Sequence, residues 1–144
     1  GYTLYNDWSA RDIQMREMKV GNGPGISKDF GMSLGPCIAT ADEFDRGAAQ
    51  LTARIDGEVW SSGTLGEMHF DFAEIIEWTT QELPLRPGDL LGSGTIAKGC
   101  GIELDRWIDQ GALVELEADG IGVLRNRVGQ KGAGPQRVVE LVPA

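Results

Sequence analysis

The sequence lacks the features that mark a disulfide scaffold, a nucleic-acid binder or a membrane span. Its two cysteines, Cys37 and Cys100, lie far apart, which predicts buried free thiols and excludes a disulfide framework or a zinc ribbon. The 13 basic residues are outnumbered by 22 acidic residues, and a net charge of −9 would repel a phosphate backbone. No apolar run could cross a bilayer, and residues 1–10 do not resemble a signal peptide. We therefore expect a cytoplasmic protein with neither nucleic acid nor a membrane as a partner.

Glycine, by contrast, is abundant. The chain of 144 residues contains 21 glycines, which occur at predicted turns rather than in a repeat. Hydrophobic residues make up 41% of the sequence, enough for one domain with a core of its own. We therefore expect residues 1–144 to form a single domain in which tight turns join short strands.

Short extended segments dominate the predicted secondary structure. Two hairpins are predicted, because Asp56-Gly57 divides residues 51–60 into two extended arms and Asp119-Gly120 joins residues 112–118 to residues 122–128. The extended or irregular segments are predicted at residues 2–5, 28–40 with a turn at Gly35-Pro36, 51–60, 90–96, 112–118 and 122–128.

Two helices are predicted between these segments. The first covers about residues 10–18, where Ser9 and Asp12 resemble a capping pair. The second covers about residues 71–80, where Asp71 pairs with the glutamate three residues later and apolar residues recur at helical spacing. Together the elements predict an α+β fold, β-rich, with layered mixed sheets and a few short helices.

Polar side chains gather at the junction between the first strand and the first helix, where Asp7, Arg11, Asp12 and Gln14 could converge on a ligand. Asp7 offers the oxygen ligands that Mg²⁺ prefers. An aspartate before a helix also commonly caps it by accepting hydrogen bonds from free backbone N–H groups. The residues alone favour the cap and leave the metal role of Asp7 open.

The segment NDWSARDIQ, which ends at Gln14, resembles the signature of the C-terminal catalytic domain in the fumarylacetoacetate hydrolase family. Further segments resemble later blocks of the family in the same order, over nearly the whole chain. These segments are SKDFGMSLGPCIATADEFD, DGEVWSSGTLGEMHFDFAEIIEW, LRPGDLLGSGTIAKGCG and GALVELEADGIGVLRNRV. Each block alone is weak evidence, but their common order identifies the chain as similar to this family throughout.

The resemblance implies a divalent metal, Mg²⁺ or else Mn²⁺ or Ca²⁺, held by two glutamates and one aspartate. Asp7 matches the aspartate of that set and is the predicted metal ligand. Lys28 matches the lysine beside the metal, where an ammonium group could stabilise an enolate or oxyanion. Glu103 resembles a glutamate that orients the catalytic histidine of fumarylacetoacetate hydrolases. Lys28 and Glu103 are therefore the predicted catalytic residues.

Three further residues match positions that bind the substrate, namely Arg11, Gln14 and Thr95. A guanidinium group suits a carboxylate, and a hydroxyl on a Gly-rich turn can approach a ligand closely. Other roles stay open on the residues alone. Arg11 could pair with Asp12 or Glu43 on the surface. Gln14 could be solvated, and Thr95 could be only a strand residue.

In the family, the two metal-binding glutamates and the water-activating histidine lie N-terminal to the strand that opens this sequence. We therefore expect that the parent protein has an upstream region that this sequence lacks. His69 matches no catalytic position, and local hydrogen bonding is its expected role.

The resemblance implies a metal-dependent hydrolase that cleaves a carbon–carbon bond of a small acylpyruvate-like 2-oxo acid through a metal-bound enolate, as in the catabolism of aromatic compounds. The alternatives are an oxaloacetate decarboxylase, a hydratase or an isomerase of the same family, or a truncated non-catalytic dimerisation module. Family members pair through this domain, so a homodimer is expected, with a small molecule as the substrate.

Overall fold

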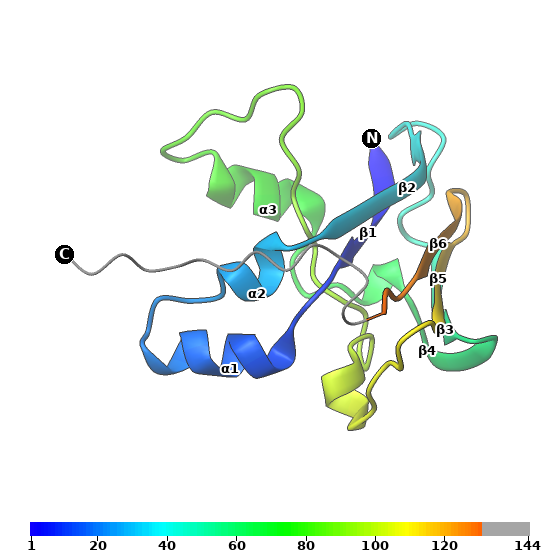
Figure 1. The fold of residues 1–144 in the computed structure, drawn as a ribbon. Helices are drawn as coiled ribbons and strands as arrows, with labels where there is room; N and C mark the ends of the chain where they lie inside the picture. Colours follow the sequence, from blue (N-terminus) through cyan, green and yellow to red (C-terminus); the bar gives the residue numbers. More distant parts are fainter. Residues whose placement is uncertain (131–144) are drawn as a thin grey trace.

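The largest layer of the fold is a four-stranded antiparallel sheet (Figure 1). The structure is a computed structural model, and it describes residues 1–130. The strands are β3 (Gln50–Ile55), β4 (Glu58–Thr64), β5 (Leu113–Ala118) and β6 (Gly122–Arg127). Their order is β4-β3-β5-β6, so the two hairpins lie side by side with β3 and β5 paired in the middle. Both predicted hairpins are confirmed, and Gly57 and Gly120 adopt the positive φ that their turns require.

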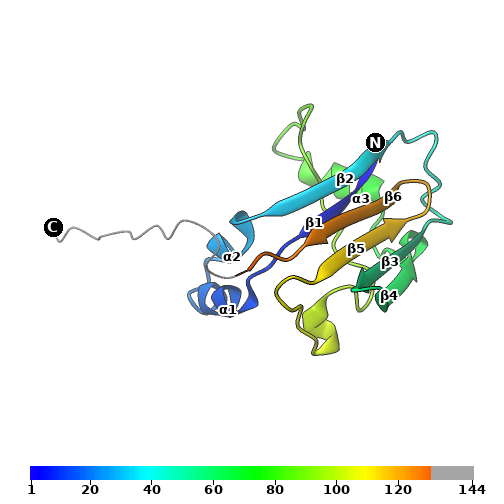
Figure 2. The same cartoon turned by 45° about the vertical axis from the view of Figure 1, so that its right-hand side comes forward.

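A second, two-stranded layer lies beside the first. It consists of β1 (Tyr2–Asp7) and β2 (Met32–Ala39). The two strands are antiparallel, and β2 runs next to β6 (Figure 2). The predicted turn at Gly35-Pro36 is wrong, because both residues lie within β2. The register shifts between Tyr2 and Leu4, and Gly35 has a φ of +136°, so β2 absorbs the irregularity as a bulge and continues.

The three α-helices lie at two places around these sheets. They are α1 (Arg11–Lys19), α2 (Ile26–Asp29) and α3 (Phe72–Thr79), with 3-10 helices at Leu65–Glu67 and Gly101–Leu104. Figure 1 shows α1 and α2 together beyond the Asp7 end of β1, whereas α3 lies near its other end, where Phe72 contacts the Tyr2 ring. The two predicted helices are confirmed as α1 and α3, and the β-rich α+β fold class is confirmed with them.

The two predicted capping pairs have different outcomes. Asp71 accepts from the backbone N–H of Glu74 at 2.9 Å, and Glu74 accepts from that of Asp71 at 2.8 Å, so this capping box is confirmed. The pair at α1 is wrong, because Ala10 occupies the N-cap position without a side-chain cap. The Ser9 hydroxyl donates instead to the backbone carbonyl of Asp7 at 3.1 Å.

The hydrophobic core lies between the β1–β2 pair and the β5–β6 hairpin. Its buried residues are Leu4, Ala39, Phe44, Ala49, Ala118, Ile121 and Leu124. Leu4 is buried in the middle of β1, whereas Tyr5 and Asp7 are exposed. The core therefore holds β1 by its centre and leaves the end that carries Asp7 at the surface.

The predicted buried strand at residues 90–96 is wrong. The structure describes this segment as an irregular loop in which only Leu91 and Ile96 are half-buried. Gly94 has a φ of +81°, and Gly99 N–H closes a tight turn onto the Ile96 carbonyl at 2.8 Å. The glycines thus favour a tightly turned loop over a strand, in spite of the apolar residues between them.

The two thiols are free, as predicted, but the expected burial is wrong. Cys37 is exposed in β2, where its Sγ atom donates to the Ile121 carbonyl at 3.3 Å, and Cys100 is half-buried.

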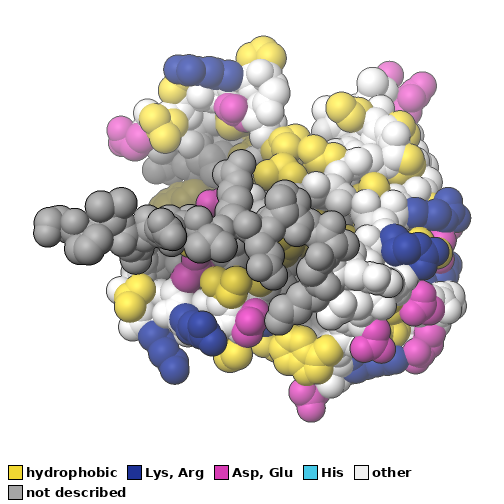
Figure 3. Space-filling view, viewed as in Figure 1, with side chains coloured by type: hydrophobic (Ala, Val, Ile, Leu, Met, Phe, Trp, Pro, Cys, Tyr) yellow, Lys and Arg dark blue, Asp and Glu magenta, His cyan; other side chains and the backbone are white. Residues whose placement is uncertain are grey.

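Charged side chains of both signs are interspersed on the face that Figure 3 shows, rather than gathered in a basic patch. The absence of a nucleic-acid partner stays a prediction. Among the described residues, no helix is long and apolar enough to cross a membrane.

Candidate functional site

Asp7 and Lys28 form an ion pair at the open end of the β1–β2 pair. The Lys28 ammonium group contacts Oδ2 of Asp7, and the Tyr5 hydroxyl donates to Oδ1 at 3.4 Å. Tyr5 and Asp7 share one face of β1 because alternate residues of a strand point the same way. Partial burial and the negative charge of Asp7 both raise the pKa of Tyr5, which keeps its hydroxyl a donor at neutral pH. The Asp7 side chain is 42% exposed, so a ligand can reach it.

Arg11, the first residue of α1, holds a second cluster. Its Nη1 atom donates to Oε1 of Gln14, one helical turn later, at 2.6 Å. Its Nη2 atom donates to Sγ of Cys100 at 2.7 Å. All three side chains are half-buried. The hydrogen bonds described for Arg11 thus go to Gln14 and Cys100 rather than to Asp12 or a surface acid.

The backbone links the two clusters. The N–H of Ala10, which precedes Arg11, donates to the carbonyl of Ser27, which precedes Lys28, at 2.9 Å. The Glu17 side chain on α1 also accepts hydrogen bonds from Gly25 and Ser27. The start of α1 and the four-residue α2 are therefore held together, so Asp7, Arg11, Gln14 and Lys28 share one region of the surface.

Thr95 lies on the Gly-rich loop that passes this region. A Cβ atom on Gly92 would lie 3.7 Å from the Tyr5 ring, so the loop runs close to β1. Thr95 itself is exposed, and in the part of the chain that the structure describes no hydrogen bond joins it to Asp7 or Arg11. Its predicted role in carboxylate binding stays a prediction.

Glu103 and His69 have local contacts. Glu103 accepts from the backbone N–H of Cys100 at 3.2 Å, at the start of a 3-10 helix, so the structure gives it a capping contact. The catalytic role predicted for Glu103 stays untested. His69 is exposed and packs edge-on against Phe70, with 4.6 Å between the ring centroids, so its described contact is aromatic rather than the expected hydrogen bond.

Sequence reasoning missed Cys100, Tyr5 and Glu17 as contributors to this region. Cys100 lies 89 positions from Arg11, and no local pattern signals that contact. Tyr5 was assigned only to a strand, although its spacing of two from Asp7 was available as a signal. Glu17 falls within the first predicted helix, and its contacts with Gly25 and Ser27 depend on the fold of the glycine-rich segment that follows.

The described residues fit only part of a metal site. The Asp7 carboxylate is a hard oxygen donor at an accessible strand end, which suits Mg²⁺. Over residues 1–130, however, the structure contains no group of three His, Cys, Asp or Glu side chains that could hold a metal ion. Asp7 can therefore supply one ligand, and the other carboxylates of a complete site must come from elsewhere.

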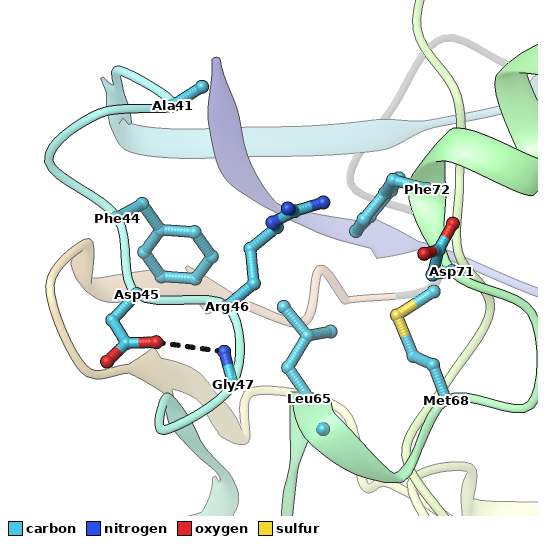
Figure 4. A pocket seen from close by; sticks show the side chains of 10 residues that line it. Ala41, Phe44, Asp45, Arg46, Gly47, Leu65, Met68, Asp71 and Phe72 are labelled. Atoms are coloured by element: carbon cyan, nitrogen blue, oxygen red, sulfur yellow. Dashed lines mark hydrogen bonds between the residues drawn. The ribbon is translucent and has the colours of Figure 1, made fainter.

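A separate pocket of about 390 Å³ lies at the opposite end of β1 (Figure 4). Arg46 points between Phe44 and Phe72 there, with its guanidinium 5.9 Å from the centroid of the Tyr2 ring. Tyr2 and Asp7 end a strand of six residues, so the pocket is about 16 Å from the ion pair at the usual rise per residue. This hollow is therefore not part of the Asp7 site.

Comparison with known proteins identifies the family. The model of the fumarylacetoacetate (FAA) hydrolase C-terminal domain matches residues 1–129. The chain belongs to this family. It is 30% identical over 133 residues to the oxaloacetate tautomerase YisK of Bacillus subtilis, covering 90% of this chain and 43% of that protein. The chain thus spans about half the length of the curated relatives that it matches.

Solved structures of the family have the same fold. The fumarylacetoacetate hydrolase of Exiguobacterium antarcticum matches with a TM-score of 0.81 at 29% identity, over 91% of this chain and 47% of that one. The 5-carboxymethyl-2-hydroxymuconate delta-isomerase of Mycobacterium smegmatis matches with a TM-score of 0.74 at 32% identity, over 92% and 49%. The family therefore includes hydrolases, tautomerases and isomerases, and membership supports an enzyme without choosing among these reactions.

Proposed function

We propose that this chain is the C-terminal catalytic part of a metal-dependent enzyme that cleaves a carbon–carbon bond of a small acylpyruvate-like 2-oxo acid. The observation that supports this most directly is the ion pair between Lys28 and Asp7 beside the Arg11 cluster. It combines a carboxylate for a hard cation with two cationic groups for an anionic substrate. Family membership supports the same class of substrate.

Each residue has a chemical role in this proposal. Arg11, held by Gln14 and Cys100, presents a guanidinium group to a substrate carboxylate. Lys28 stabilises the negative charge that develops on the 2-oxo oxygen as the bond breaks. Asp7 would hold Mg²⁺, or Mn²⁺ or Ca²⁺, and the bound cation would polarise the 2-oxo acid group as a Lewis acid. We propose that Thr95 contacts the carboxylate of the substrate that lies farther from the metal. Glu103 has no part in the proposed reaction, because its carboxylate accepts a hydrogen bond from the backbone N–H of Cys100.

A second candidate is the tautomerisation or isomerisation of a 2-oxo acid such as oxaloacetate. It is favoured by the similarity to an oxaloacetate tautomerase and to a muconate isomerase. An enolate oxygen stabilised by Lys28 serves this reaction as well, because a proton then moves without cleavage of the carbon chain.

An assay on the full-length protein separates the two candidates. Acylpyruvates and oxaloacetate are offered with Mg²⁺ or Mn²⁺. Hydrolysis of an acylpyruvate releases pyruvate and a carboxylic acid, whereas tautomerisation of oxaloacetate changes its ultraviolet absorbance without cleaving the carbon chain. A reaction without protein corrects for the decarboxylation of oxaloacetate that the metal ions promote. If the proposal is right, Lys28→Met lowers kcat of either reaction by about a hundredfold, to a residual rate that can still be measured. Lys19→Met, a change at an exposed lysine of α1, leaves the rate unchanged. Equal rates in both variants would refute the role of Lys28.

We also propose that the protein forms a homodimer. Large apolar residues are exposed along β2, including Met32, Leu34 and Ile38, and their burial against a second copy would be favourable. Light scattering tests this, and a monomer throughout the micromolar range would contradict it.

A further inference from the structure

Glu17 and Ser27 connect α1 to α2 immediately before Lys28. The Oε2 atom of Glu17 accepts from the Ser27 hydroxyl, from the Gly25 N–H at 3.0 Å and from the Ser27 N–H at 3.4 Å. Ser27 is fully buried, with 0% exposure, although Ile26 before it is exposed and Lys28 after it is half-buried. The hydrogen bonds of Ser27 and Gly25 lower the pKa of Glu17, because they stabilise its ionised carboxylate.

We infer that Glu17 is a positioning residue that fixes Lys28 against Asp7, an inference that rests on the role proposed for Lys28. Helix α2 has only four residues and follows a glycine-rich segment, so it is too short to be stable alone. Glu17 holds its first turn from one side, and the Ala10 N–H holds the Ser27 carbonyl from the other. Glu17 itself has no described contact with Asp7 or Lys28, so it acts through the backbone of α2.

Zero-length crosslinking tests this placement without reference to activity. A carbodiimide joins an amine to a carboxylate in contact with it, forming an amide with loss of water, and mass spectrometry measures the Asp7–Lys28 product. We expect the yield to fall severalfold in Glu17→Ala and less in Glu17→Gln, which keeps one acceptor oxygen. Asp12→Asn is the matched control, because Asp12 is exposed on the same helix. Unchanged yield in Glu17→Ala, with the fold intact by circular dichroism, overturns the inference.

Kinetics of the full-length enzyme distinguish positioning from general stability. With Lys28 present, Glu17→Ala lowers kcat by about tenfold and changes KM little, since the Arg11 cluster is untouched. In a Lys28→Met background the same change has no further effect on kcat, because the group that it positions is gone. Equal losses in both backgrounds overturn the inference. If the crosslink falls as expected but the wild-type enzyme turns over no 2-oxo acid, the proposed function fails while the placement of Lys28 by Glu17 stands.

Discussion

The Lys28 ammonium group contacts the Asp7 carboxylate although 21 positions separate the two residues in the sequence. Asp7 ends a strand, and Lys28 lies in a helix that α1 holds in place. Sequence reasoning alone favoured Asp7 as a helix cap. The structure gives that position to Ala10 and leaves the carboxylate of Asp7 accessible at the surface. The cap is therefore excluded for Asp7, and metal binding by Asp7 stays a proposal.

Asp7→Ala in the full-length protein is expected to lower metal-dependent kcat/KM by at least about a hundredfold, because it would remove the oxygen ligand that we propose for the metal. The fold stays intact, since the Asp7 side chain is 42% exposed and contributes little to the core. Rate assays and circular dichroism check both parts, with Asp12→Ala as the control. Wild-type activity in Asp7→Ala would remove Asp7 from the site.

Arg11→Lys is expected to lower kcat/KM by about tenfold, because one ammonium group cannot replace a planar guanidinium that binds two partners at once. The matched control is Arg16→Lys, a change at an exposed residue of the same helix. Steady-state kinetics with one 2-oxo acid give the two ratios. Equal ratios would mean that Arg11 has only a structural role in holding Cys100.

The stability conferred by Glu17 is expected to depend on pH. Its pKa is lowered in the folded protein, mainly by the Ser27 hydroxyl, so its contribution to stability is present at neutral pH and is lost as the pH falls through the lowered pKa. Glu17→Gln removes the charge and should lower Tm at pH 7, with the difference from wild type narrowing in acid. Thermal unfolding at several pH values measures this, and a constant difference would contradict the assignment.

Phe44→Ala is expected to destabilise the fold by about 3 kcal/mol, because it leaves a cavity in the core. Phe44 is 7% exposed, and its ring centroid lies 5.1 Å from that of Tyr2. Phe70 is 60% exposed, and Phe70→Ala should change the free energy of unfolding by no more than about 0.5 kcal/mol. Urea titration compares the two. A small loss in Phe44→Ala would show that the core lies elsewhere.

Local chemistry explains which parts of the fold were predictable. The turns at Asp56-Gly57 and Asp119-Gly120 and the Asp71 capping box need only neighbouring residues, and all three were found. The turn expected at Gly35-Pro36 failed because pairing with β1 keeps both residues in a strand. At Gly35-Pro36, the pairing of β2 with β1 therefore outweighs the intrinsic preference of these residues for a turn.

The sequence could predict that four candidate residues lie together, but not their contacts, and their roles in a site stay predictions. Resemblance pointed to Asp7, Arg11, Gln14 and Lys28, and the structure places them in one region. The contact of Arg11 with Cys100 joins residues 89 positions apart, and no sequence spacing encodes it. Similarly, Ser27 follows a glycine-rich segment, and only the packing of α2 against α1 brings its hydroxyl to the Glu17 carboxylate.

The isolated chain of 144 residues is expected to bind Mg²⁺ weakly. Mg²⁺ gives up its hydration reluctantly, and a single carboxylate with waters compensates little of its charge, so we expect a Kd no tighter than roughly millimolar. Lys28 already occupies one side of the Asp7 carboxylate, which weakens the site further. Since the described residues contain no group of three potential metal ligands, we also expect this chain to hydrolyse no acylpyruvate.

Isothermal titration with Mg²⁺ and Mn²⁺, together with an acylpyruvate assay, tests both expectations. The full-length protein is the control, and it should bind the same ions far more tightly, because two further carboxylates would then compensate the charge. Tight one-to-one binding by the 144-residue chain would require Asp12, Glu17 or Glu103 to complete the site. Glu17 and Glu103 would first have to release the backbone N–H groups of Gly25 and Cys100. That outcome would overturn the single-ligand assignment of Asp7, and if Glu17 supplied the added ligand it would overturn the positioning role of Glu17 as well.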